Sequence, residues 1–229
     1  GFYHLPGDSH LFRDWKKKGH GTVNLHKAIE QSCDTYFYQL AGRIGVDRFH
    51  DWMLQFGFGR PTGIDLVNEK SGTLPSIAWK RSRLKAPWYP GEMMSVGIGQ
   101  GYFTATPLQL AMGTAIIANK GQHITPHLLK SVSGPYPFTT VNQPDGQVQF
   151  SGDPAEWDRM RDAMKAVVHG YGTAGNLRRG LTGYEIAGKT GTAQVKGIKQ
   201  GERYSESRLD PRHWDHAWFM GFAPADAPK

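Results

Sequence analysis

The chain of 229 residues is poor in cysteine and has no long apolar run. Its single cysteine, Cys33, excludes a disulfide within this sequence and leaves the redox compartment open. The longest apolar stretch, LQLAMGTAIIA, is only about half of the ~20 residues that a membrane-spanning helix needs, so the sequence predicts no membrane span. There is also no internal repeat or low-complexity segment. A hydrophobic content of 38% is enough for one sizeable core, which predicts a globular domain.

The sequence also lacks the start and end signals that a complete chain of this kind would show. The first residues, GFYHLPGDSH, do not begin with Met and lack the basic, apolar and small-residue regions of a signal peptide. The last residues, HAWFMGFAPADAPK, stop just after an expected strand and turn, where a further partner strand is expected. We therefore expect these residues to be a piece of a longer chain.

Acidic residues are outnumbered by basic ones, so the formal net charge is +7 and the isoelectric point is near 9.5. The basic residues cluster in RDWKKKGH, WKRSRLKAPW and LRRG, next to aromatic, Gly or Pro residues. Such clusters are typical of surface loops near an anionic polymer, lipid head groups or nucleic acid. Charge alone does not choose between these partners.

Apolar residues spaced by three and four predict helices with capping signals at their ends. The expected helices cover 25–43 behind Asn24, 48–56 behind Asp47, 107–119 with Pro107 at its first position, and 154–169 behind Asp153. The turn-rich segment 60–76 is expected to be a loop and edge strand, and strands are expected over 184–195 and 216–224. Because the helices precede the strands, we expect an α+β fold with an antiparallel sheet.

Two further segments are expected to be irregular. SVGIGQG, residues 95–101, fits neither phosphate-loop spacing, and we interpret it as a close-packed turn under the floor of the site. The long polar segment 195–215 is expected to be a mobile loop beside the site.

The strand EIAGKTGTAQV ends in a group of polar residues suited to binding an anion. Lys189 could supply a positive charge, and the hydroxyls of Thr190 and Thr192 could bind a carboxylate or relay a proton. Gly191, without a side chain, would let a ligand lie against the strand edge. A polar strand-to-turn junction would give the same letters. However, SCD at 32–34 lies upstream, and serine motifs of this kind accompany K-T-G in penicillin-binding proteins and class A β-lactamases.

Several segments in the same order make the resemblance specific. The chain resembles the transpeptidase domain of class B penicillin-binding proteins, above all the elongation-type enzymes of Gram-negative bacteria. The segments that carry it are DWKKKGHGTVNLHKAIEQSCDTYFYQLA, FGFGRPTGIDL, SVGIGQGYFTATPLQLA, YGTAG, IAGKTGTAQV and HAWFMGFAP. The resemblance implies the penicillin-binding/β-lactamase-like fold, an antiparallel sheet flanked by helices on both sides. It also implies a penicillin-sensitive D,D-transpeptidase that cross-links stem peptides through a serine acyl-enzyme.

The resemblance assigns roles to the residues that match its motifs. Ser32 matches the serine of the second motif, whose hydroxyl would hydrogen-bond the general base or the leaving amine. Asp34 stands where many relatives have Asn. An ionised carboxylate accepts but does not donate, so this departure puts any donation to the substrate in question.

The third motif, Lys189 to Thr192, would bind the terminal carboxylate of the substrate. Thr190 and Thr192 would contact the carboxylate, with Gly191 leaving room beside them. Lys189 would keep the field positive and help proton transfer.

The first motif, SxxK, is the missing part. The only literal match is SRLK, Ser82 to Lys85, which follows the second motif and lies in a charge-dense, Pro-bounded segment. A nucleophile should instead begin a buried helix that lowers the pKa of its hydroxyl. We therefore expect the acylated serine to lie upstream of Gly1, and residues 1–229 to be a fragment of one transpeptidase domain that also lacks its C-terminal end.

Asp14, His20 and Cys33 form a possible metal site with the spacing D-x5-H-x12-C. Mixed oxygen, nitrogen and sulfur ligands suit tetrahedral zinc, which here would act structurally behind the active face. Some enzymes of the resembled subgroup have a zinc at matching positions. The alternative is that Cys33 is a small core residue. Further ligands considered for the fourth position are His4, Asp8 and His10.

The resemblance also implies partners and a location. It implies binding of peptidoglycan stem peptides and β-lactams, contact with a membrane-embedded glycosyltransferase and elongation-complex proteins, and a role in cell shape. The protein would lie at the periplasmic face of the inner membrane, anchored by an N-terminal helix outside this sequence; we expect no nucleic-acid partner and no organic cofactor. Two alternatives stay open: a serine β-lactamase or β-lactam sensor of the same fold, and a non-catalytic cell-wall-binding module.

Overall fold

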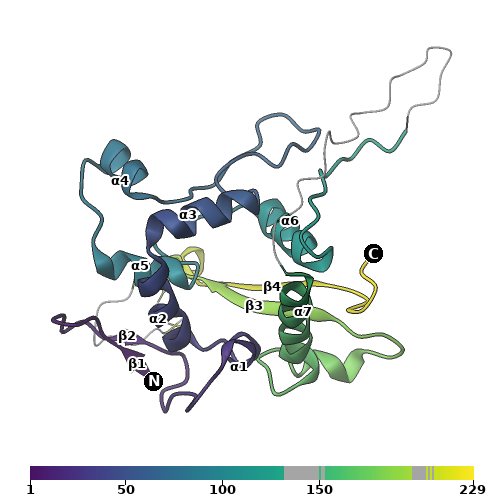
Figure 1. Cartoon of the computed structure of the whole chain (residues 1–229), viewed down its shortest axis with the longest axis horizontal. Coiled ribbons are helices and arrows are strands. Elements are labelled where there is room, and N and C mark those ends of the chain that lie inside the picture. Colours follow the sequence, from purple (N-terminus) through teal and green to yellow (C-terminus); the bar gives the residue numbers. More distant parts are fainter. Residues whose placement is uncertain (132–149, 151–152, 198–204, 206, 208) are drawn as a thin grey trace.

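A computed structural model describes residues 1–131, 150, 153–197, 205, 207 and 209–229. Helices dominate the first two thirds of the chain, and the longer strands come at its end (Figure 1). The elements are β1 (Phe2–Tyr3), β2 (Phe12–Arg13), α1 (Leu25–Glu30), α2 (Asp34–Ile44), α3 (Val46–Gln55), α4 (Ile77–Leu84), α5 (Pro90–Gly97), α6 (Pro107–Ala118), α7 (Pro154–His169), the 3-10 helix η1 (Leu177–Gly180), β3 (Ala187–Ala193), the 3-10 helix η3 (Pro211–His213) and β4 (His216–Phe222).

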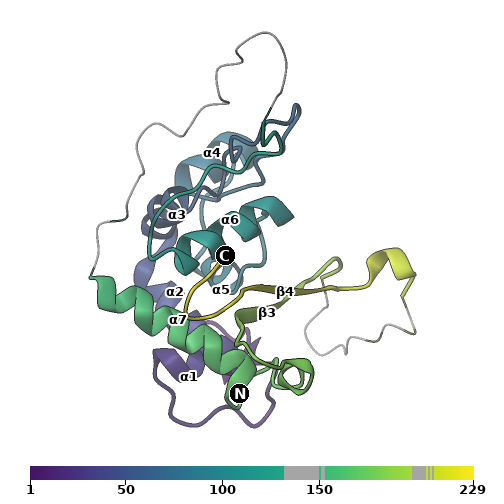
Figure 2. The same cartoon turned by 90° about the vertical axis from the view of Figure 1, so that its right-hand side faces the viewer.

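The strands β3 and β4 form an antiparallel ribbon, with Lys189 opposite Met220 and Thr192 opposite Ala217. Helix α7 packs against β3 and α6 against β4, whereas β1 and β2 form a small antiparallel pair of their own. Figure 2 shows the far end of the ribbon projecting away from the helices. The predicted α+β fold with an antiparallel sheet is confirmed.

Two groups of buried apolar side chains hold these elements together. The first joins α1 and α7 to the ribbon and contains Ile29, Val167 and Ala187. The second joins α2 to α5 and contains Ala41 and Met94. Strand β3 starts in the first cluster, where Ala187 is buried, and its last residues are exposed to solvent.

The prediction of one helix over 25–43 is wrong, because the chain breaks at Ser32. Helix α1 ends at Glu30 and α2 begins at Asp34, and Ser32 between them has a left-handed backbone with φ of 52°. The indole Nε1 of Trp15 donates to the carbonyls of Gln31 (3.1 Å) and Ser32 (2.9 Å), which withdraws both carbonyls from a helical ladder. Ser32 thus lies in a turn, not on a helix.

The other predicted elements differ mainly at their ends. The helix 154–169 is observed with its predicted bounds, 48–56 appears as α3 and 107–119 as α6. Segment 60–76 is a loop whose strand character is limited to one bridge between Thr73 and Thr104. Helices α4 and α5 were not predicted, and α5 contains the first three residues of SVGIGQG. Much of segment 195–215 lies outside the described residues, so its expected mobility stays a prediction.

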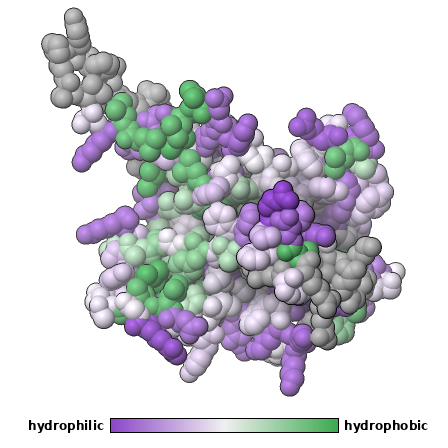
Figure 3. Space-filling view, turned by 180° about the vertical axis from the view of Figure 1, so that it is seen from behind, coloured by the Kyte–Doolittle hydropathy of each residue, from purple (hydrophilic) through white to green (hydrophobic). Residues whose placement is uncertain are grey.

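Exposed apolar residues gather on two neighbouring loops, residues 60–70 and 124–129. The carboxylate of Asp65 in the first loop holds the second. It accepts hydrogen bonds from the backbone N–H groups of Leu128 (2.7 Å) and Leu129 (2.9 Å). Val67 is 88% exposed, and Leu66 and Leu128 are exposed as well. Figure 3 shows these loops as an apolar area on the rear face of the molecule. No helix within the described ranges combines the length and apolar character needed to cross a bilayer.

Candidate active site

The turn between α1 and α2 meets strand β3 at two predicted site residues. The ammonium of Lys189 donates a hydrogen bond to the hydroxyl of Ser32, although the two residues are far apart in sequence. The same ammonium donates to the carbonyl of Thr190 at 2.9 Å and lies 3.5 Å from its hydroxyl. The structure therefore brings the second and third motifs together at one place.

A third segment adds a hydroxyl that the sequence analysis did not single out. Thr173 Oγ1 lies 2.6 Å from Thr190 Oγ1, so two hydroxyls stand side by side next to the ammonium. The loop carrying Thr173 is tied to the end of α1, because Glu30 accepts from the backbone N–H of Tyr171 (2.7 Å) and of Thr173 (3.3 Å). The only sequence signal for Thr173 was its place in the segment YGTAG.

The two glycines of β3 differ in what packing requires of them. A Cβ added at Gly188 would lie 2.7 Å from the Met220 carbonyl oxygen, so packing against β4 demands glycine there. A Cβ at Gly191 would meet nothing closer than Trp218 Cβ at 3.6 Å, an ordinary contact. Packing therefore does not explain Gly191, and the space beside it is open.

Asp34 and Lys189 have perturbed pKa values because both are largely shielded from water. Burial raises the pKa of Asp34 to about 6; the backbone N–H of Trp15, which donates to it at 3.2 Å, opposes the rise, as does Lys189, whereas Asp14 adds to it. Burial also lowers the pKa of Lys189 to about 8, and the charge of Asp34 opposes this fall. Both groups are therefore charged between about pH 6 and pH 8, and Asp34 can donate a hydrogen bond only below that window.

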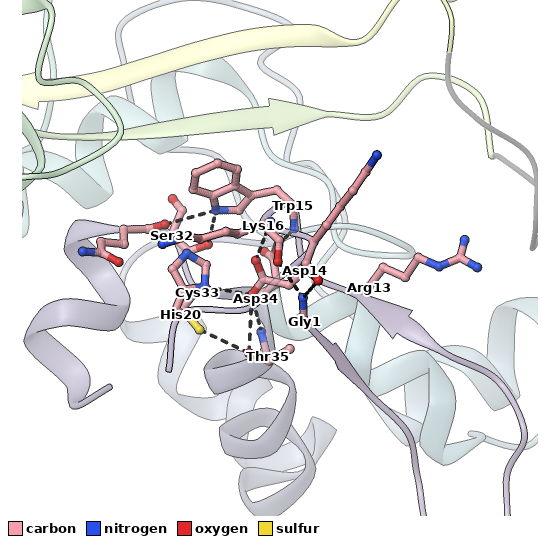
Figure 4. A network of polar contacts seen from close by, with 12 residues as sticks. Gly1, Arg13, Asp14, Trp15, Lys16, His20, Ser32, Cys33, Asp34 and Thr35 are labelled. Carbon is pink, nitrogen blue, oxygen red and sulfur yellow. Dashed lines mark hydrogen bonds and ion pairs between the residues drawn. The ribbon is translucent and has the colours of Figure 1, made fainter. Parts of the chain in front are cut away.

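Trp15 supports the turn that presents Ser32, and sequence reasoning missed it. Its indole and backbone N–H groups hold the carbonyl of Ser32 and the carboxylate of Asp34. Figure 4 shows these residues together at the join of the two helices. Positive φ is uncommon for a residue with a side chain, so the turn needs such outside support.

Asp14, His20 and Cys33 lie together behind this turn. All three are buried, and their ligand atoms lie within 4.8 Å of one another. Neither ring nitrogen of His20 has a hydrogen-bond partner among the described residues, although Nδ1 is 3.4 Å from Asp14 Oδ2. His4 and His10, two of the residues considered as a fourth ligand, are exposed and outside this group, as is Asp8.

A buried imidazole without partners is costly, so these donors suit a bound cation. Sulfur, nitrogen and carboxylate oxygen are the donor types of zinc sites. The backbone N–H of Thr35 and of Lys16 donate to the Asp14 carboxylate at 3.2 and 2.9 Å, which would orient it as a ligand.

Ser82 of the literal SxxK match does not reach the site. Its hydroxyl donates to the carbonyl of Trp79 at 3.0 Å within α4, where it is exposed. Figures 1 and 2 both place α4 well away from β3.

The fold, together with the contact between Lys189 and Ser32, is that expected for a penicillin-binding transpeptidase domain, and comparison with known families gives the same class. The chain belongs to the penicillin-binding protein transpeptidase family, whose transpeptidase-domain model matches residues 1–229. This finding confirms the resemblance on which the site residues were chosen.

Several of the individual relatives share one name, peptidoglycan D,D-transpeptidase MrdA. The chain is 57% identical to peptidoglycan D,D-transpeptidase MrdA of Acinetobacter baumannii over 229 residues, which is 100% of this chain and 34% of that protein. The crystal structure of Pseudomonas aeruginosa PBP2 in complex with WCK 5153 is 45% identical with a TM-score of 0.83, covering 100% of this chain and 46% of that one. The PBP2 of Helicobacter pylori in complex with MreC is 36% identical with a TM-score of 0.84, covering 100% and 38%. The chain spans about a third of the length of the curated relatives it matches.

Proposed function

We propose that the protein containing this chain is a peptidoglycan D,D-transpeptidase that cross-links stem peptides during cell-wall elongation. The observation that carries the proposal is the hydrogen bond from the Lys189 ammonium to the Ser32 hydroxyl beside the open end of β3. This arrangement offers a proton relay and a carboxylate site within one small volume. Membership of the penicillin-binding transpeptidase family and the identity to MrdA support the same reaction.

The reaction has two steps, each of which needs a proton moved. A serine hydroxyl attacks the carbonyl between the two D-alanines of one stem peptide, the C–N bond breaks, and the terminal D-alanine leaves with a proton on its amine. The amine of a second stem peptide then attacks the acyl-enzyme ester, loses a proton and frees the serine. In our proposal Ser32 and Lys189 pass these protons, and Thr190 and Thr192 bind the terminal carboxylate.

We place the acylated serine outside residues 1–229. The position of Ser82, on an exposed helix away from β3, supports this assignment. The relatives are about three times longer than this chain, so they have ample room for the missing motif.

The experiment that tests the function is labelling of the full-length protein with a fluorescent penicillin, followed by peptide mapping. We expect a serine of an SxxK motif outside 1–229 to carry the label, and Lys189→Ala to slow acylation roughly 10²–10³-fold, as loss of a preorganised donor does. Lys196→Ala, an exposed residue with the same charge change, is the matched control. Label on Ser82 would contradict the motif assignment, and a stable protein that takes no label would favour a non-catalytic module. A short acyl-enzyme lifetime would indicate a β-lactamase.

We also propose that Asp14, His20 and Cys33 hold a structural zinc ion. The support is the buried imidazole of His20, whose nitrogens have no hydrogen-bond partner within the described part of the chain. The metal would tie the loop of Asp14 and His20 to the turn that presents Ser32. Metal analysis should find about one zinc per protein, and Cys33→Ser should lose it and lower the unfolding temperature; an equal metal content in both proteins would exclude the site.

The partners and location follow from the same assignment. We propose that the protein works at the periplasmic face of the inner membrane, with a membrane-embedded glycosyltransferase and other proteins of cell elongation. The complex of Helicobacter pylori PBP2 with MreC and a related peptidoglycan synthase complex support partners of these kinds. Crosslinking of the full-length protein in cells tests this proposal, and recovery without any membrane or cell-wall protein would contradict it.

A further inference from the structure

One edge of β3 pairs with β4, and the other edge faces the site. Backbone groups of a strand alternate between its two edges. The carbonyl of Thr190 accepts from Lys189, and the carbonyl of Thr192 and the N–H of Gln194 also bond to side chains. Residues 190, 192 and 194 therefore present their backbone groups to the edge opposite β4.

The side chain of Gln100 occupies this edge. Its amide nitrogen donates to the carbonyl of Thr192, and its amide oxygen accepts from the N–H of Gln194 at 3.3 Å. A primary amide offers the same donor and acceptor as a peptide group. The Gln100 side chain thus occupies one backbone carbonyl and one backbone N–H, the two groups that a peptide added as a further strand would use.

The backbone of Gln100 is fixed independently of β3. Its N–H donates to the carbonyl of Ser95 at 2.9 Å at the end of α5, and it stands between Gly99 and Gly101, whose φ values are 77° and 68°. Because both neighbours adopt left-handed conformations that favour glycine, the turn has a defined shape. The carboxamide is therefore presented to β3 by α5.

A peptide bound through its carboxylate would meet this side chain. The start of β3 is buried, so a ligand whose carboxylate lies at Thr190 and Thr192 can extend along the free edge only towards Gln194. There it reaches the two backbone groups that Gln100 holds. Thr192 and Gln194 are exposed and Gln100 is half-buried, so the side chain can leave without unpacking a core.

We infer that the Gln100 carboxamide is a built-in occupant of the peptide-binding edge of β3, and that an extended acyl donor binds by exchanging with it. The inference rests on the proposed transpeptidase function. Each hydrogen bond lost to Gln100 is replaced by one to the peptide backbone, so exchange is possible at small net cost. Ligands that carry no peptide-like arm gain nothing from the exchange, which makes Gln100 a determinant of ligand preference.

The test measures acylation rate constants of the full-length protein with two β-lactams, one with an acylamino arm and one without it. Gln100→Ala should raise the constant about fivefold or more for the β-lactam with the arm and leave the other unchanged, because only the arm competes for Thr192 and Gln194. Gln100→Glu, which keeps the size but cannot donate to the Thr192 carbonyl, should act in the same direction. Gln122→Ala, at an exposed glutamine, is the control and should change neither constant.

The possible outcomes separate the two proposals. A fall for both β-lactams would show that Gln100 supports the strand, and an equal rise or no change for both would also overturn the exchange. A wild-type protein that is not acylated at all would overturn the proposed function, and the inference with it.

Discussion

Gly97 lies where α5 packs against α2, and replacing it with Ala sets two effects of opposite sign against each other. A Cβ at this position would lie 2.4 Å from Ala41 Cβ, whereas apolar carbons in contact are about 3.5–4.0 Å apart. The helices would have to separate by about 1 Å, and overpacking of this kind costs about 1–3 kcal/mol. The gain from Gly to Ala in a helix is only about 0.5–1 kcal/mol.

The two effects leave a net destabilisation of up to about 2.5 kcal/mol. We therefore expect Gly97→Ala to cost about 1 kcal/mol, the middle of this range, which lowers Tm by about 2–4 °C for a domain of this size. The assay is thermal unfolding of the full-length protein followed by tryptophan fluorescence. Gly42→Ala is the matched control, because Gly42 is exposed in α2 and an added Cβ would meet only the end of Met94 at 3.4 Å. It should stabilise the protein by about 0.5–1 kcal/mol. If Gly97→Ala stabilises as well, the close packing of α2 against α5 is refuted.

Two further changes probe the site and the turn that supports it, and a third probes a buried ion pair between α4 and α5. Trp15→Phe removes the N–H that holds the Ser32 turn, so it should cost about 1 kcal/mol and slow acylation by penicillin; unchanged unfolding and acylation would contradict the role of the indole. Lys189 is charged below its pKa of about 8, so acylation should fall as pH rises through 8, and a flat profile between pH 7 and 9 would contradict the role of its charge. Glu92→Gln leaves the buried ammonium of Lys80 without its ion-pair partner, which should cost about 3 kcal/mol in chemical unfolding; a loss below about 1 kcal/mol would show that the surrounding aromatic rings suffice.

Capping residues and apolar periodicity in the sequence predicted the bounds of a helix where both signals were present, as in α7. Helix α7 has an Asp153 cap that accepts from Ala155, a Pro at its first position and a clear apolar stripe, so its bounds followed from the sequence. Helix α4 does have a local cap, because the Ser76 hydroxyl accepts from the backbone N–H of Trp79, but it has no apolar stripe. Its one buried residue is Lys80, whose burial depends on Glu92 from the next helix. Burial of a lysine is a tertiary effect that periodicity does not report.

The candidate site was found through motifs, and its geometry was not predictable from periodicity. A continuous apolar stripe favoured one helix through Ser32, but a tryptophan 17 positions earlier takes the carbonyl that the helix would use. The same limit applies to Gln100, whose contact with Thr192 spans 92 positions. Long-range hydrogen bonds of this kind outweigh local preference, and a single sequence gives no signal for them.

The break at Ser32 lies between two buried apolar clusters. Ile29 at one end of α1 belongs to the core that carries β3, and Ala41 in α2 belongs to the core that includes α5. The serine hydroxyl thus lies between the two clusters, with Lys189 on the strand that belongs to the first and Asp34 on the helix that contributes to the second. A substitution in the first cluster would therefore displace Lys189 relative to Ser32, and a substitution in the second cluster would displace Asp34.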